Sequence, residues 1–146
     1  MIEVHGNMWN YLNRKGFVIC ITTNKYIKND GTAVMGAGCS KEAADQFPDL
    51  PYLLGQSIKT RGNVVSSLRK DILSFPVKYN WFEKGNPSLI KKSVAELKKR
   101  AEERPKLKFI LPRPGCGNGK LKYKQIRHLL ECLPDNVFVI CKDGEE

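Results

Sequence analysis

The sequence predicts an α/β protein: a three-layer α/β/α sandwich with a mixed central sheet, built as a single domain over residues 1–146. One observation is a set of short apolar runs rich in β-branched residues, which are typical of buried strands. A second is that such runs alternate with helical periodicity in the second half of the chain. A third is a pair of glycine-rich segments, each lying between an apolar run and a helical pattern.

The first half of the chain is expected to contain four strands and two helices. The apolar run FVICIT at 17–22 indicates a buried strand. A helix that begins at Cys39 should end before Pro48, because proline cannot continue a helix. Arg69 and Lys70 are expected to form the turn between two paired strands. The elements predicted here are strands at 2–4 and 17–22, helices at 39–47 and 52–60, and strands at 64–68 and 71–75.

The second half alternates helices with strands. Asn86 followed by Pro87 predicts a helix start, since Asn caps free backbone N–H groups and proline suits the first helical position. Apolar residues then recur at helical spacing as far as Ala101. A second helical stripe runs from about Lys122 to Leu133 and includes Cys132. Strands are predicted at 107–111 and 137–141.

The composition favours an intracellular, cytoplasmic protein with anionic partners. The chain has 25 Lys and Arg against 15 Asp and Glu, a formal net charge of +10. This charge favours nucleotides, nucleic acid or an acidic surface, although a basic solvated face is the simpler alternative. Five cysteines without a CxxC pair argue against a zinc site and for a reducing compartment. No membrane-spanning run or signal peptide is visible, and we expect a monomer that needs no cofactor or metal.

Two glycine-rich loops are the most informative local feature. The segments 36–38 and 115–119 expose backbone N–H groups that can face a phosphate, and their glycines keep Cβ atoms out of the way. Because ligands of open α/β sheets gather beyond the C-terminal strand ends, we expect the loops to hold two sides of a diphosphate. Tight turns that need a positive φ are the alternative. Neither loop matches the P-loop or GxGxxG, which disfavours kinases, ATPases and dehydrogenases.

Several motifs, in the same order over nearly the whole chain, resemble the macrodomain family, whose members bind ADP-ribose. They are GNM at 6–8, Asn24 after the second strand, VMGAG at 34–38 with FP at 47–48 behind it, and LPRPGCGNG at 111–119. The segment SFPVKYNW at 74–81 and the GCGNG motif are similar to one branch of that family. This branch contains the terminal ADP-ribose glycohydrolase and the DarG antitoxin macrodomain, which removes ADP-ribose from DNA. The resemblance implies the macrodomain fold and an ADP-ribose site.

The resemblance also implies roles for individual residues. Asn7 would contact adenine, Asn24 would face the distal ribose and assist catalysis, and Lys78 would be the catalytic lysine. Further ADP-ribose contacts would come from Gly6, Met8, Met35, Gly36, Ala37, Gly38, Cys39, Pro114, Gly115, Cys116, Gly117, Asn118 and Gly119.

The sequence departs from that branch in three places. Gly119 stands where the branch carries a catalytic Asp in the second loop. Ile21 replaces the first member of a paired Asn-x-x-Asn. The segment from Lys25 to Thr32 resembles an insertion beside the site.

Lys78 has two interpretations. Burial or nearby positive charge lowers the pKa of a lysine and makes its amine a nucleophile, able to attack C1″ of a ribose or otherwise assist glycosidic cleavage. Alternatively, Lys78 extends its charge into solvent, as is the default on so basic a chain. Trp81 and Phe82 either stack on a base or cap the core. Asp30 is a weaker candidate acid, because Asn-Asp-Gly favours a turn.

The function expected from the sequence is ADP-ribose binding with ADP-ribosyl glycohydrolase activity on a modified acceptor. The basic charge makes nucleic acid one candidate acceptor. Two alternatives stay open. One is an ADP-ribose-1″-phosphate phosphatase, and the other is a non-catalytic protein that only binds ADP-ribose, which the missing loop acid favours.

Overall fold

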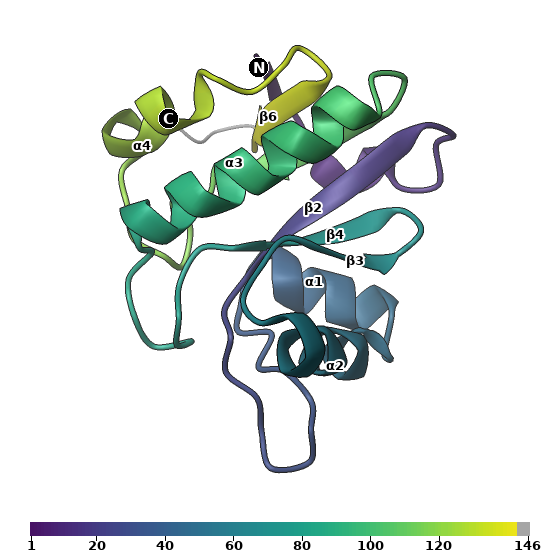
Figure 1. Cartoon of the computed structure of the whole chain (residues 1–146), viewed down its shortest axis with the longest axis vertical. Helices are drawn as coiled ribbons and strands as arrows, with labels where there is room; N and C mark the ends of the chain where they lie inside the picture. Colours follow the sequence, from purple (N-terminus) through teal and green to yellow (C-terminus); the bar gives the residue numbers. More distant parts are fainter. Residues whose placement is uncertain (143–146) are drawn as a thin grey trace.

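The computed structural model describes residues 1–142, which form a six-stranded sheet with helices on both faces (Figure 1). The strand order is β1-β6-β5-β2-β4-β3, and β3 is antiparallel to its neighbour while the other pairs are parallel. The sheet is therefore mixed, as predicted. The strands are β1 (Ile2–His5), β2 (Phe17–Thr23), β3 (Ser66–Arg69), β4 (Ile72–Pro76), β5 (Lys108–Pro112) and β6 (Val137–Cys141). The helices are η1 (Met8–Tyr11), α1 (Cys39–Gln46), α2 (Leu50–Arg61), α3 (Pro87–Glu103) and α4 (Tyr123–Leu130).

Alternation along β2 produces the three layers. Val18 and Cys20 belong to the apolar cluster beneath α3 and α4, whereas Ile19 and Ile21 belong to the cluster on the α1 and α2 side. Successive strand residues point to opposite faces, so one strand with no polar interruption serves both clusters. Figure 1 shows α1 and α2 on one side of the sheet and α3 on the other. This confirms the α/β/α sandwich expected from the sequence.

The helix α3 begins where the sequence predicts. The Asn86 side chain accepts a hydrogen bond from Leu89 N at 3.1 Å, and Pro87 occupies the first helical position. One face buries a stripe that includes Ile90, Val94 and Leu97, while the lysines lie on the opposite, more exposed face. The helix closes one face of the sheet and fixes the loop that precedes it.

The last helix starts at Tyr123, next to the predicted start at about Lys122, but a turn that was not predicted separates it from the second glycine-rich loop. Lys120 has a left-handed φ of 60°, and Leu121 N donates to Gly115 O at 2.9 Å, so the chain turns back before α4 starts at Tyr123. The end of α4, at Leu130, comes earlier than the predicted end at Leu133. Leu133 is still buried, but both it and Cys132 lie in the turn after the helix.

The short 3-10 helix η1 was not predicted. Its N-cap is Asn7, whose Oδ1 accepts a hydrogen bond from Trp9 N at 2.9 Å. A single turn has no periodicity that a sequence pattern can reveal, which explains why it was missed. The turn matters because it presents Met8 and Trp9 at the end of β1, beside the cavity described below.

The topology places several loops at one edge of the sheet. The neighbours β2 and β5 are parallel, but the chain leaves β2 towards α1 and leaves β5 towards α4, on the opposite face. Such a point opens a crevice beyond the carboxyl ends of the strands. The strands β1, β4 and β6 run in the same direction as β2 and β5, so the segments that follow them begin at the same edge of the sheet.

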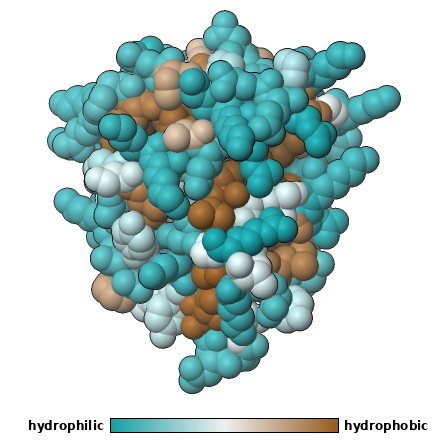
Figure 2. Space-filling model, in the orientation of Figure 1, coloured by the Kyte–Doolittle hydropathy of each residue, from teal (hydrophilic) through white to brown (hydrophobic). Residues whose placement is uncertain are grey.

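The surface seen in Figure 2 is mostly hydrophilic, and apolar atoms emerge only in separate patches between polar side chains. Within residues 1–142, no helix has both the length and the apolar character needed to span a membrane.

Candidate functional site

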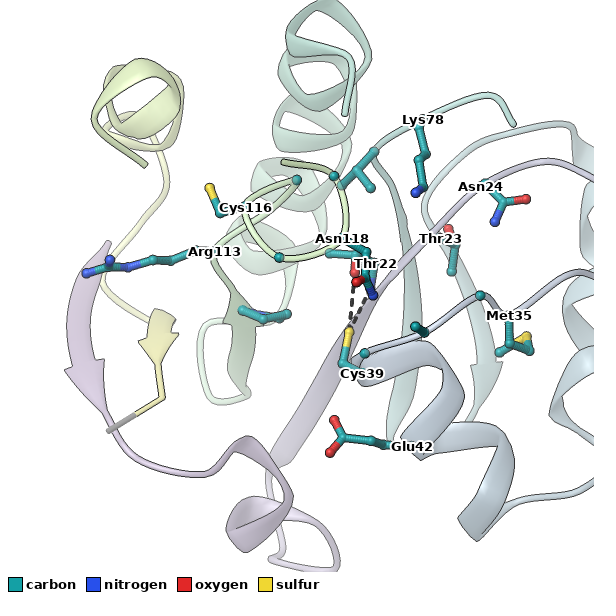
Figure 3. A pocket seen from close by; sticks show the side chains of 18 of the residues that line it. Thr22, Thr23, Asn24, Met35, Cys39, Glu42, Lys78, Arg113, Cys116 and Asn118 are labelled. Atoms are coloured by element: carbon teal, nitrogen blue, oxygen red, sulfur yellow. Dashed lines mark hydrogen bonds between the residues drawn. The ribbon is translucent and has the colours of Figure 1, made fainter. Parts of the chain in front are cut away.

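A cavity of about 840 Å³ lies at the edge where the parallel strands end. Its walls come from the segments that follow β1, β2, β4, β5 and β6. Figure 3 shows Lys78 and Glu42 at opposite ends of this cavity, with Cys39 and Asn118 between them. A space of this size accommodates a nucleotide-sized ligand.

The first glycine-rich loop opens directly into α1. Gly36 has a φ of +68° and Gly38 a φ of +76°, both in the left-handed region that favours glycine. Gly38 is the N-cap of α1, so the free backbone N–H groups of the first helical turn face this end of the loop. Positive partial charge at a helix N-terminus stabilises an anion, which makes this wall suitable for a phosphate.

The second glycine-rich loop is folded tightly on itself. A Cβ atom on Gly119 would lie 2.7 Å from Gly115 Cα, and one on Gly115 would lie 2.9 Å from Leu121 Cδ1. Gly117 has open space instead, since a Cβ atom there would have no neighbour within 4 Å. Gly115 and Gly119 therefore allow the close packing inside this loop, whereas Gly117 leaves space on the open side of the loop.

The two loops approach each other across the cavity. Asn118 Nδ2 lies 3.0 Å from the position that a Cβ of Gly38 would occupy. Between them, Cys39 Sγ lies 3.3 Å from Thr22 Oγ1 (Figure 3), and Ser40 Oγ donates to Thr22 O. These contacts fix the start of α1 against the end of β2. Burial raises the pKa of the Cys39 thiol, so it is not an activated nucleophile.

Lys78 lies in the loop between β4 and α3. Backbone hydrogen bonds from Val77 N to Thr23 O at 3.0 Å and from Asn86 N to Val77 O at 2.7 Å hold both sides of that loop. Lys78 Nζ donates to Trp81 O at 3.0 Å. Partial burial lowers the pKa of Lys78 below its usual value, Lys120 lowers it further, and Glu83 partly opposes both.

The opposite end of the cavity lies between η1 and α1. Trp9 Nε1 is 3.4 Å from Glu42 Oε1, and Asn7 and Met8 border the same end. The Asn7 side-chain oxygen already caps η1, which leaves its amide N–H groups available to a ligand. An indole beside a carboxylate provides a flat surface and a hydrogen-bond acceptor, a combination suited to a nucleobase that carries an amino group.

No family model and no curated protein sequence matches the chain. Its structure, however, matches the macrodomain of Thermus aquaticus DarG with a TM-score of 0.73 and 23% identity, over 98% of this chain and 97% of that one. The macrodomain of Mycobacterium tuberculosis DarG matches with a TM-score of 0.72 and 18% identity, over 99% of this chain and 100% of that one. The chain has the macrodomain fold.

A third matching structure is Thermosipho africanus DarTG in complex with ADP-ribose. The match has a TM-score of 0.74 and 19% identity, and it covers 100% of this chain but 43% of that one. The resemblance inferred from the sequence motifs is thus confirmed at the level of fold.

The structure brings together the site residues that were predicted from the sequence. All of them line the cavity except Pro114, which is buried. Their roles in binding remain predictions. Asp30 does not line the cavity, and its carboxylate accepts hydrogen bonds from Thr32 in a turn. Trp81 and Phe82 are 51% and 68% exposed, so they do not cap the core.

Several lining residues lie outside the motifs and candidates found in the sequence. They are Trp9, Thr22, Thr23, Glu42, Glu83, Lys84, Lys120, Ile140 and Lys142. Three more, Val77, Pro112 and Arg113, lie within the quoted motifs but had been given no role. A glutamate four residues after Gly38 was a usable signal, because it falls in the first turn of a helix that opens at the cavity. Lys142 had none, since its place depends on β6 ending beside β1.

The charged side chains that line the cavity are mostly basic. Five basic side chains and two carboxylates line it, and the two carboxylates are Glu42 and Glu83. Within residues 1–142 no group of three His, Cys, Asp or Glu side chains could hold a metal ion. The excess of positive charge favours an anionic ligand.

Proposed function

We propose that the cavity binds ADP-ribose and that the protein is an ADP-ribosyl glycohydrolase. The observation that supports this most strongly is the placement of Lys78 at one end of a crevice bordered by both glycine-rich loops. The diphosphate would lie between the loops, adenine against the adjoining side chains of Trp9 and Glu42, and the distal ribose towards Lys78. A ligand in this orientation brings its C1″ carbon to the lysine.

Lys78 would act as the nucleophile. Its lowered pKa increases the fraction of neutral amine, which is the reactive form. The amine attacks C1″, the bond from C1″ to the acceptor breaks, and the acceptor leaves with a proton from the attacking nitrogen. Water then attacks C1″, which breaks its bond to the lysine nitrogen, releases ADP-ribose and restores the amine. No loop acid is needed for the first bond to form, which accommodates Gly119 in the place of an Asp.

Substitution of Lys78 tests this role. Lys78→Ala should reduce turnover by about a hundredfold or more while the dissociation constant of free ADP-ribose stays within about threefold, since nucleophilic assistance acts mainly in the transition state. Lys91→Ala is the matched control and should leave turnover unchanged, because Lys91 is an exposed lysine of α3 outside the cavity. Equal turnover by Lys78→Ala and wild type would contradict a catalytic lysine.

The pH profile gives an independent check. Turnover should rise with pH as Lys78 loses its proton. Lys120→Gln removes a positive neighbour, so it should raise the pKa of Lys78 and move the rise to higher pH. Glu83→Gln removes the opposing carboxylate and should move the rise to lower pH. Profiles that are identical in all three proteins would mean that Lys78 is not the titrating group.

The acceptor is proposed to be nucleic acid. Trp81 and Phe82 meet edge to face, with ring centroids 5.6 Å apart, at the Lys78 end of the cavity. The cavity that these exposed aromatic rings line also contains Lys84 and Lys120. A stacking surface together with positive charge is what single-stranded nucleic acid needs. Each stacked base contributes about 1–3 kcal/mol in such sites.

The acceptor test compares three substrates: ADP-ribosylated single-stranded DNA, ADP-ribosylated protein and ADP-ribose-1″-phosphate. Cleavage of the DNA substrate, weakened by salt and by Trp81→Ala but not by Tyr52→Ala, would support nucleic acid. Tyr52 is a suitable control because it is 54% exposed on α2, outside the cavity. Loss of the 1″-phosphate alone would identify a phosphatase, and binding without any cleavage a non-catalytic ADP-ribose binder.

A further inference from the structure

Three neighbouring strands begin at the end of the sheet opposite the cavity. They are β5, β2 and β4, which lie side by side and run in the same direction. Lys108 N donates to Gly16 O at 2.8 Å and Ile19 N to Asp71 O at 2.8 Å, so the segments that lead into these strands adjoin one another. Figure 1 shows their turns at the right of the view, away from the loops that border the cavity.

The segments 13–16, 70–71 and 104–108 contain six basic residues but one acidic residue, the partly buried Asp71. All six basic residues are exposed, and no ion pair within residues 1–142 involves any of them. Glu102, which precedes the third segment, pairs with Lys98 instead. We call this surface the basic edge, and its residues are Arg14, Lys15, Lys70, Arg104, Lys106 and Lys108.

Two cations of the basic edge rest on aromatic rings. Arg14 Cζ lies 5.0 Å from the centre of the Tyr11 ring, and Lys108 Nζ lies 5.2 Å from the centre of the Phe17 ring. The two rings meet edge to face, with their centroids 5.3 Å apart. A side chain that already rests on a ring loses less conformational freedom when it binds a ligand. Arg14 and Lys108 are therefore partly ordered before any partner arrives.

The chemistry of the basic edge favours a polyanion over an ordinary protein partner. None of the large exposed apolar side chains found within residues 1–142 belongs to its three segments. Protein interfaces are centred on buried aromatic or aliphatic anchors, whereas a phosphate backbone requires mainly positive charge. The cations also occupy a face of Tyr11 and of Phe17, which leaves these rings poorly suited to stacking on a base.

We propose that the basic edge binds the phosphate backbone of nucleic acid, whatever the base sequence. Contacts to phosphates position a protein on nucleic acid without reading its sequence. This surface is separate from the cavity, because it lies at the opposite end of the same strands. The inference does not depend on the proposed function, and it predicts that nucleic acid and free ADP-ribose bind at the same time.

Fluorescence anisotropy with an unmodified, labelled DNA duplex at several salt concentrations tests the inference. A variant that combines Lys15→Gln, Lys106→Gln and Lys108→Gln should bind the duplex at least about tenfold more weakly at low salt. The slope of log affinity against log salt should become shallower by about 2–3, since each phosphate contact contributes about 0.9. Its melting temperature should match that of the wild type, because all three side chains are exposed. Arg14→Gln with Lys70→Gln serves as a second variant if the triple variant does not fold.

A control variant separates a local surface from net charge. Lys91→Gln, Lys92→Gln and Lys99→Gln together remove the same charge from exposed positions of α3. This variant should lose less than about threefold in affinity, because exposed charges far from the bound phosphates are screened by salt. Equal losses in the two triple variants would overturn the proposal, and so would a wild-type protein that does not bind the duplex at low salt. Binding of polyglutamate through the basic edge without binding of the duplex would overturn it in favour of an acidic protein partner.

The proposed function and the basic edge can fail separately. Saturating ADP-ribose and Trp81→Ala should leave the affinity for the duplex unchanged, and the triple variant of the basic edge should bind free ADP-ribose as the wild type does. Displacement of the duplex by ADP-ribose would place it in the cavity and overturn the inference alone. Binding of the duplex through the basic edge without any binding of ADP-ribose would overturn the proposed function alone.

Discussion

The two glycine-rich loops line the same cavity but use their glycines differently. In the first loop, Gly36 has a positive φ, and a Cβ atom added there would have no neighbour within 4 Å. Glycine is therefore needed at this position for its backbone conformation and not for space. In the second loop, Gly119 would place a Cβ within 2.8 Å of Gly115 C, so glycine is needed there for space. Only Gly117 combines an ordinary φ with open surroundings. A count of glycines therefore overstates how many of them a ligand can approach.

Gly119→Ala should have the largest effect on stability. The new methyl group would overlap the backbone of Gly115, which a side-chain rearrangement cannot relieve. We expect a loss on the order of 3 kcal/mol, at the upper end for overpacking. Thermal unfolding measures the loss, and Gly117→Ala is the matched control with little change expected. Equal stability of the two variants would mean that the second loop is not closely folded.

Gly117→Glu should have the largest effect on binding without a comparable effect on stability. The side chain enters open space, but its carboxylate would face the diphosphate and occupy its place. We expect at least a hundredfold loss of ADP-ribose affinity, or about 2.8 kcal/mol at 1.4 kcal/mol per tenfold. The ligand-induced rise in melting temperature should disappear. A rise as large as that of the wild type would place the ligand elsewhere.

Gly36→Ala should cost less, and for a different reason. There is room for the methyl group, but a left-handed φ of +68° disfavours any residue with a Cβ. The expected loss is about 1–2 kcal/mol of unfolding free energy. Denaturant unfolding provides the measurement. A loss equal to that of Gly119→Ala would remove the distinction between the loops.

Asn118→Ala should have the smallest effect. Its amide nitrogen lies beside Gly38 and helps the second loop reach the first. Removing it should weaken ADP-ribose binding by about 1 kcal/mol or less, the typical contribution of one hydrogen bond. Calorimetry can detect this change. A hundredfold loss would instead make Asn118 a principal ligand contact.

Much of the fold was accessible from the sequence because its signals are local. The run at 17–22 and the Asn86-Pro87 pair predicted β2 and the start of α3, and proline at 48 marked the end of α1. The start of α4 at Tyr123 was also predicted closely, but the turn before it was not accessible. That turn depends on Leu121 packing against Gly115 and Gly85, a contact that no sequence pattern reveals.

The candidate site was predictable where motifs mark it and not where the fold assembles it. The glycine-rich segments and the FPVK context singled out the two loops and Lys78 before their proximity was known. The hydrogen bonds of Asn24 with Tyr26 and Val34 could not be predicted, because they depend on the path of the chain over residues 25–33. Nor could the pairing of Trp9 with Glu42, which are brought together from η1 and α1.

Titration calorimetry of the wild-type protein with free ADP-ribose tests the central claim most directly, because ADP-ribose should bind between the two loops. We expect saturable binding with one site per chain, and no heat of binding for Gly117→Glu at an unchanged melting temperature. No heat from the wild type at millimolar ADP-ribose would contradict the claim that this cavity is an ADP-ribose site.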